Sequence, residues 1–155
     1  MSVSVQEADF DVGAETAALS AGRLDVGAVA TFVGLVRADK LSGAGSEVSA
    51  MTLEHYPGMT ERQLAAVEAE AQSRWPLARS LIVHRYGRLE PGEQIVLVAC
   101  ASSHREAALE ACHFLIDWLK TRAPFWKLEE AESEARWVEA RSEDDQAAER
   151  WEKSR

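Results

Sequence analysis

The chain has 155 residues, of which 46% are hydrophobic and 28% are charged, and its net charge is −9 at pH 7. This composition predicts one soluble globular domain over residues 1–155 and argues against a nucleic-acid partner, which normally requires a basic surface. No apolar run approaches the roughly 20 residues that cross a membrane, and the N-terminus lacks the basic-then-apolar pattern of a secretory signal, so the expected location is the cytoplasm.

Several strands are predicted from short apolar and β-branched runs. In chain order they cover residues 28–33, 48–55, 80–86 and 94–99, with short late strands near 125–128 and 136–139. A turn around Pro91 and Gly92 joins the third strand to the fourth. The segment 38–47, which contains two glycines, reads as a loop.

Two long helices are predicted between these strands. The first starts at Thr60 with the capping-box pattern Thr60–Gln63 and continues to Pro76. The second starts at Ser103 with a similar pattern, keeps helical apolar spacing to Leu119, and ends before Pro124. Residues 142–155 are predicted to be a frayed helix or a flexible tail. The element order predicts an α+β sandwich of two main helices over a mixed or antiparallel sheet.

The segment Leu119–Lys127 is the first candidate for chemistry, because it places three cations and two aromatic residues close together in an acidic chain. A lysine held against a partly dry aromatic surface can have its pKa lowered and act as an acid, a base or a nucleophile. The alternative is that Lys120 and Arg122 only complement the negative end of the helix dipole.

Three further cations are candidates for binding an anion. His104 and Arg105 fall in the first turn of the second helix, where free backbone N–H groups favour a phosphate or carboxylate. Arg37 follows Gly34 at the end of a strand and can reach into a cleft. Each of these residues could instead be ordinary surface charge.

The spacing of these candidates constrains how they combine. His104 and Lys120 lie about 24 Å apart if they share one helix with a rise of 1.5 Å per residue. They cannot both contact one small ligand within a single chain. Either they belong to separate sites, or a second copy of the chain completes the pocket.

The cysteines and histidines indicate neither a disulfide framework nor a metal site. Cys100 and Cys112 match no metal-binding spacing and fall in apolar surroundings, which favours two buried small hydrophobic residues. The four histidines show no HxxxH or HxH spacing. We therefore expect no metal and no cofactor.

Four segments, in this order, resemble the large, catalytic subunit of molybdopterin synthase. They are Gly27–Arg37 (GAVATFVGLVR), Leu53–Met59 (LEHYPGM), Ser103–Arg105 (SHR) and Leu119–Lys127 (LKTRAPFWK). The later segment Arg136–Arg141 is also similar to that family, so the resemblance covers about residues 25–151.

The resemblance implies a hammerhead-like α+β fold and a sulfurtransferase of molybdenum cofactor biosynthesis. The sulfur donor would be the C-terminal Gly-Gly thiocarboxylate of a small ubiquitin-like subunit, and the acceptor cyclic pyranopterin monophosphate, which becomes the molybdopterin dithiolene. The assembly would be a heterotetramer around a homodimer of this chain.

The resemblance also implies roles for particular residues. Lys120 would be the main catalytic residue and Lys127 would assist it, whereas Arg37, His104, Arg105 and Arg141 would bind the substrate. His104 and Arg105 would come from the second copy of the chain.

Two other interpretations of the same residues remain open. Lys120 could form a Schiff base with a carbonyl substrate, which borohydride trapping would detect. Alternatively, the chain could be a non-catalytic module that binds a partner's C-terminal tail in a basic groove.

Overall fold

The computed structural model describes residues 2–38, 50–131, 134–138 and 142–153. Within this part of the chain lie four helices and eight strands, in the order β1 (Val3–Gln6), α1 (Val12–Ser20), β2 (Ala28–Leu35), β3 (Ala50–His55), α2 (Met59–Arg74), β4 (Leu77–Arg85), β5 (Gly87–Leu89), β6 (Gln94–Ser102), α3 (Arg105–Thr121), β7 (Phe125–Ala131), β8 (Glu134–Val138) and α4 (Ser142–Lys153).

The first sheet has the strand order β1-β4-β6-β2, and helices cover both of its faces. Strand β1 is parallel to β4, and the other neighbours are antiparallel, so the sheet is mixed. Because side chains alternate along a strand, Ile82 and Val98 pack with α2 and α3, whereas Leu81 and Leu97 pack with α1. This sheet holds the main core.

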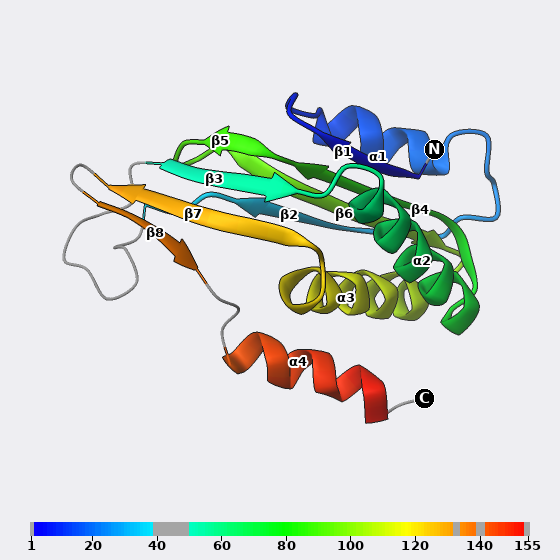
Figure 1. Cartoon of the computed structure of the whole chain (residues 1–155). Coiled ribbons are helices and arrows are strands. Elements are labelled where there is room, and N and C mark those ends of the chain that lie inside the picture. The colour runs from blue at the N-terminus through cyan, green and yellow to red at the C-terminus, as the bar shows by residue number, and fades with distance from the viewer. Residues whose placement is uncertain (1, 39–49, 132–133, 139–141, 154–155) are drawn as a thin grey trace.

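The second sheet has the order β5-β3-β7-β8 and extends away from the helices (Figure 1). The chain enters it after β4 through Gly87 and leaves it through Gly92, and both glycines have a positive φ that other residues rarely adopt. Strands β4 and β6 therefore pair as predicted, but β5 lies between them in the chain and belongs to the other sheet.

The predicted fold class is confirmed, and the two long helices are α2 and α3. Their predicted starts are wrong. The N-cap of α2 is Gly58, with a φ of 83°, and the Glu61 side chain accepts a hydrogen bond from its backbone N–H. The N-cap of α3 is His104, whose side chain makes no capping hydrogen bond.

Three elements were not predicted, namely β1, α1 and β5. Of the two alternatives predicted for residues 142–155, a frayed helix or a flexible tail, the structure has a helix, α4, which packs beside α3 through Trp151. The Trp151 indole N–H donates to the Asp117 carboxylate, and Arg122 forms an ion pair with Glu152. No helix of the described residues is long and apolar enough to cross a membrane.

Candidate active site

Lys120 lies in the last turn of α3 with its side chain exposed. Arg122, the C-cap of the helix, donates its backbone N–H to the Trp118 carbonyl and is paired through its guanidinium with Glu152 of α4. The two cations therefore differ in role: Arg122 helps to hold α4, whereas Lys120 faces solvent. The side chains that the structure describes do not surround Lys120 with the dry aromatic surface that the sequence suggested.

Lys127 lies in β7, seven residues after Lys120. In the backbone register of the second sheet, Lys127 is opposite Leu53 of β3 on one side and Val138 of β8 on the other. Its side chain lies outside the described part of the structure. The backbone places Lys127 in the inner strand of the sheet, just beyond the turn that follows α3 (Figure 1).

Contacts between two segments that are distant in the sequence fix this turn. The Thr60 hydroxyl accepts a hydrogen bond from the Tyr56 N–H at 3.1 Å and donates one to the Pro124 carbonyl at 3.3 Å. The Thr60 side chain is fully buried. In addition, β3 pairs with β7 so that His55 is opposite Phe125. The LEHYPGM segment therefore supports the lysine segment directly.

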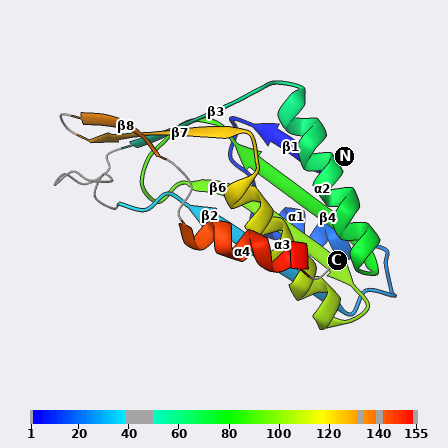
Figure 2. The same cartoon turned by 60° about the horizontal axis from the view of Figure 1, so that its bottom comes forward.

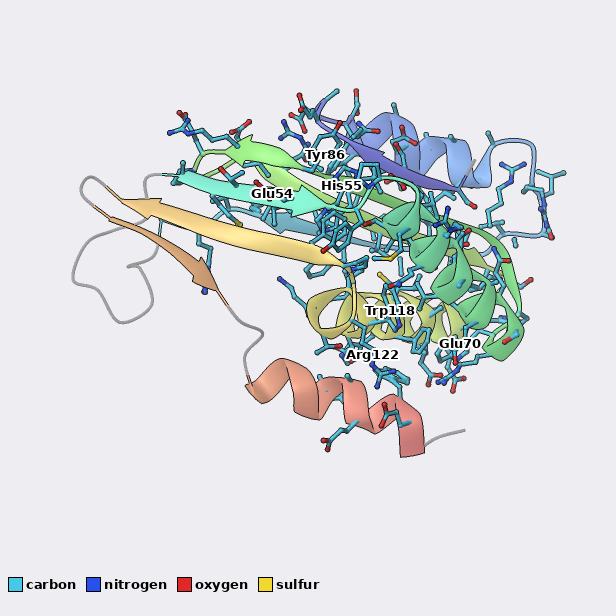
Figure 3. The ribbon with its side chains drawn as sticks, viewed as in Figure 1. Glu54, His55, Glu70, Tyr86, Trp118 and Arg122 are labelled. Atoms are coloured by element: carbon cyan, nitrogen blue, oxygen red, sulfur yellow. The ribbon has the colours of Figure 1, made fainter. Side chains whose placement is uncertain are left out.

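A row of aromatic rings extends this support into the first sheet. Phe125 stacks on buried His84, with ring centroids 3.8 Å apart, and lies 6.2 Å from His55. His55 packs against Tyr86 at 4.4 Å, and Figure 3 shows these two side chains close together. The His55 Nε2 atom lies 3.6 Å from Glu61. The LEHYPGM segment entered the sequence analysis only as part of the family resemblance, with no sign that it would hold Phe125.

Arg37 lies at the same end of the first sheet as Lys120. Strand β2 is antiparallel to β6, and α3 follows β6 and runs back along the sheet, so β2 and α3 point in the same direction. Eight strand residues span about 26 Å and seventeen helical residues about 25 Å. The exposed Arg37, just after β2, is therefore close to the level of Lys120.

His104 and Arg105 lie at the opposite end of α3, where both are exposed. The structure confirms that they share one helix with Lys120, about 24 Å along its axis. The fold therefore brings Arg37, Lys120 and the start of β7 to one end of the molecule. It leaves His104 and Arg105 at the opposite end. Arg141 and residues 39–49, which include most of the loop predicted over 38–47, lie outside the described residues.

The two thiols are unsuited to catalysis. Cys100 and Cys112 are free and buried, and burial raises the pKa of Cys112 to about 11 and that of Cys100 further. A thiol with a raised pKa is rarely the reactive thiolate at neutral pH. The prediction of two buried structural cysteines is confirmed.

The described residues contain no group of His, Cys, Asp or Glu side chains suited to a metal ion. A cavity between α2, α3 and α4, near Glu70, Trp118 and Arg122 in Figure 3, has a volume of about 20 Å³. That is room for about one water molecule, so it is not a substrate pocket. Because Lys120 is exposed, a binding site there requires further residues around it.

Solved structures place this architecture in a known class. The MoaE protein of Burkholderia ambifaria superposes with a TM-score of 0.82 at 51% identity, covering 97% of each chain. Molybdopterin synthase of Staphylococcus aureus superposes with a TM-score of 0.81 at 28% identity, covering 89% of this chain and 97% of that one. The fold is that of the MoaE proteins.

The sequence comparisons are equally extensive. The model of the MoaE protein family matches residues 5–122. The molybdopterin synthase catalytic subunit of Pseudomonas aeruginosa is 57% identical over 152 residues, which cover 98% of this chain and 99% of the relative. The chain therefore belongs to the MoaE family of molybdopterin synthase catalytic subunits, and it is a sulfurtransferase of molybdenum cofactor biosynthesis.

Proposed function

We propose that this chain transfers sulfur from the C-terminal thiocarboxylate of a small ubiquitin-like subunit to cyclic pyranopterin monophosphate, forming the molybdopterin dithiolene. The name "catalytic subunit" carried by the relatives agrees with a second subunit that is not itself catalytic. We expect the reaction in the cytoplasm, and the complex to be a heterotetramer around a homodimer of this chain.

The observation that supports this proposal is that Lys120, the start of β7 and Arg37 lie at the same end of the molecule. A thiocarboxylate is already a strong nucleophile, so the enzyme requires no thiol of its own, in agreement with the buried cysteines. It requires cations that hold the substrate's phosphate and a proton source for the departing oxygen. Lysine and arginine side chains at this end of the molecule would meet both needs.

We assign Lys120 as the main catalytic residue, either as an acid and base or as an electrostatic clamp on the thiocarboxylate. Lys127 would assist it and orient the substrate, and Arg37 would bind the phosphate. His104 and Arg105 would reach the substrate from the second copy of the chain, because about 24 Å of helix separates them from their own Lys120. Arg141 would contribute a further cation.

The test is dithiolene formation by the purified chain, supplied with the thiocarboxylated small subunit and cyclic pyranopterin monophosphate. We expect Lys120→Ala to lower turnover by about 100-fold or more, the usual effect of removing a positioned acid or base, while the small subunit still binds. The matched control is Arg122→Ala, which removes a cation of the same segment that is paired with Glu152 and should leave most of the turnover.

The outcomes separate this proposal from its rivals. Binding of the small subunit without product formation by the native chain would contradict the proposed reaction. A loss of partner binding that parallels the loss of product in Lys120→Ala would instead indicate that Lys120 serves docking.

A further inference from the structure

His84 is a buried ionisable side chain that the proposed reaction does not use. It lies near the end of β4, is only 8% exposed, and its Nδ1 atom lies 2.8 Å from the Arg85 carbonyl oxygen. Because a carbonyl oxygen can only accept a hydrogen bond, Nδ1 carries the hydrogen atom and donates it. This contact with the backbone of its own strand restrains the orientation of the imidazole ring.

The face of this ring is stacked on Phe125, the first residue of β7. The ring centroids lie 3.8 Å apart and the ring planes are inclined by 16°, so the two rings are nearly parallel. The contact of Phe125 with His55 is looser, with centroids 6.2 Å apart and planes inclined by 33°. Stacked aromatic rings stabilise a contact beyond the area that they bury, so His84 is the closer support of Phe125.

The stack connects the two sheets of the molecule. Strand β4 is an inner strand of the first sheet and β7 of the second, and among the residues that the structure describes no strand of one sheet pairs with a strand of the other. Figure 2 shows β7 starting at the turn that follows α3 and running away from the helices. Without backbone pairing between two sheets, the packing of side chains at their junction holds their relative orientation.

The two lysines of the proposed site lie on different sides of this junction. Lys120 is carried by α3, whose buried Leu115 shares the main core with Val98 of the first sheet. Lys127 is carried by β7, two residues after Phe125. A change in the position of Phe125 therefore moves the strand that carries Lys127 with respect to the helix that carries Lys120.

Thr60 holds the same turn through a different kind of contact. Its hydroxyl donates to the Pro124 carbonyl from the start of α2, and so restrains the backbone of the turn. His84 instead contacts the side chain of the next residue from the first sheet. It therefore restrains the direction in which β7 leaves the turn.

We propose that His84 is a positioning residue for sulfur transfer, because its stack on Phe125 holds β7 so that Lys127 and Lys120 act on the same substrate. The role of the two lysines rests on the proposed function, whereas the anchoring of β7 by the stack does not.

A double-mutant cycle tests this assignment. His84→Leu keeps a buried side chain of similar size but removes the flat ring, and we expect it to lower kcat/KM for dithiolene formation about 10-fold, because a small misplacement of a catalytic group slows the reaction strongly. In a Lys127→Ala background the same substitution should change kcat/KM less than about 2-fold, because the group that it displaces is already absent. In an Arg37→Ala background the loss should remain, because Arg37 follows β2 of the first sheet.

His84→Phe is the matched variant, because it keeps a ring that can stack and removes only the hydrogen bond to the Arg85 carbonyl. We expect it to retain at least about half of the native kcat/KM. Hydrogen exchange of the backbone amides gives a readout that requires no activity. Exchange at residues 125–128 should become at least about 10-fold faster relative to α2 in His84→Leu, and should stay as in the native chain in His84→Phe.

Equal losses of kcat/KM in the Lys127→Ala and Arg37→Ala backgrounds would overturn the assignment, because a merely structural residue lowers activity in either background. Native kcat/KM in His84→Leu would overturn it as well, as would a His84→Phe variant that is equally impaired. If the native chain forms no dithiolene, the proposed function fails and hydrogen exchange decides on the anchoring alone. Faster exchange in β7 of His84→Leu would then support the stack as its anchor, and unchanged exchange would contradict it.

Discussion

At the scale of single residues, Gly27 lies where the start of β2 comes very close to the backbone between β6 and α3. Its N–H donates to the Ser102 carbonyl at 2.9 Å, at the point where β2 starts beside the end of β6. A Cβ at position 27 would lie 2.2 Å from the Ser103 carbonyl oxygen. Because the carbonyl belongs to the backbone and the position of a Cβ is fixed by the backbone, no side-chain rotation can relieve this contact.

We expect Gly27→Ala to destabilise the chain by about 2 kcal/mol or more, the upper part of the range for overpacking, and to shift the start of α3, which carries His104 and Arg105. Urea unfolding measures the effect. The same substitution at Gly13, in α1, is the control, because its Cβ would come no closer than 3.4 Å to Asp11 and alanine favours a helix. Equal stabilities of the two variants would contradict the argument.

At the scale of elements, the junction between α3 and β7 depends on the start of α2. The Thr60 hydroxyl accepts a hydrogen bond from the Tyr56 N–H and donates one to the Pro124 carbonyl, so it links the start of α2 to this junction. Since Pro124 lies between Lys120 and Lys127, a shift of Thr60 changes the relative position of the two lysines. Thr60 thereby acts on the site through the backbone and is a positioning residue.

We expect Thr60→Val, which preserves the shape of the side chain, to lower turnover about 10-fold and stability by roughly 1 kcal/mol, because it removes the part-buried hydrogen bonds to the Tyr56 N–H and the Pro124 carbonyl. Thr60→Ser keeps the hydroxyl and should retain most of the turnover at a smaller cost in stability. Steady-state kinetics of both variants, with thermal unfolding alongside, separate the two effects. Native turnover in Thr60→Val would show that Pro124 is held by other contacts.

The elements that the sequence predicted are those with a strong local pattern. The helices α2 and α3 each have a periodic apolar face, and β4 and β6 contain the apolar runs Leu81–Val83 and Ile95–Ala101. The helix α1 lacks such a face, and β1 has only four residues, so neither gave a clear signal. The place of β5 in the second sheet depends on pairing with β3, which no local pattern reveals.

The candidate site was predictable to a similar degree. The residue types at Arg37, Lys120 and Lys127 indicated an anion site, and the length of the helix indicated that His104 and Arg105 lie too far away to share it. The supporting contacts of Thr60, His84 and Phe125 were not predictable, because each joins segments that are distant in the chain. Sequence patterns identify reactive groups more readily than the residues that hold them.

At the scale of the whole molecule, the proposed site is divided between two chains, and the distribution of positive charge agrees with this division. The chain carries a net charge of −9, yet cations lie at both ends of α3. In the proposed function, Lys120 at one end of the helix acts on the same substrate as His104 and Arg105 from the other end of a second copy, so each site takes its cations from two chains. Two chains would then form two such sites, each made of one helix end from each chain, in an otherwise acidic molecule that repels other anions.

This arrangement predicts complementation between two inactive variants. Lys120→Ala and Arg105→Ala should each reduce dithiolene formation at least about 10-fold when prepared alone. In mixed dimers obtained by co-expression, one site would carry both substitutions and the other neither. Since about half of randomly formed dimers are mixed and each has one intact site, about a quarter of the native activity should return.

Sites built from a single chain would behave differently, because every site in the mixture would still carry one substitution. The control is a mixture of Lys120→Ala with Lys120→Met, in which no arrangement of subunits restores a lysine. Recovery in the first mixture and none in the second would show that Lys120 and Arg105 act across the dimer. Equal, low activity in both mixtures would place the two residues in separate sites, and α3 would then contribute only one of its ends to each reaction.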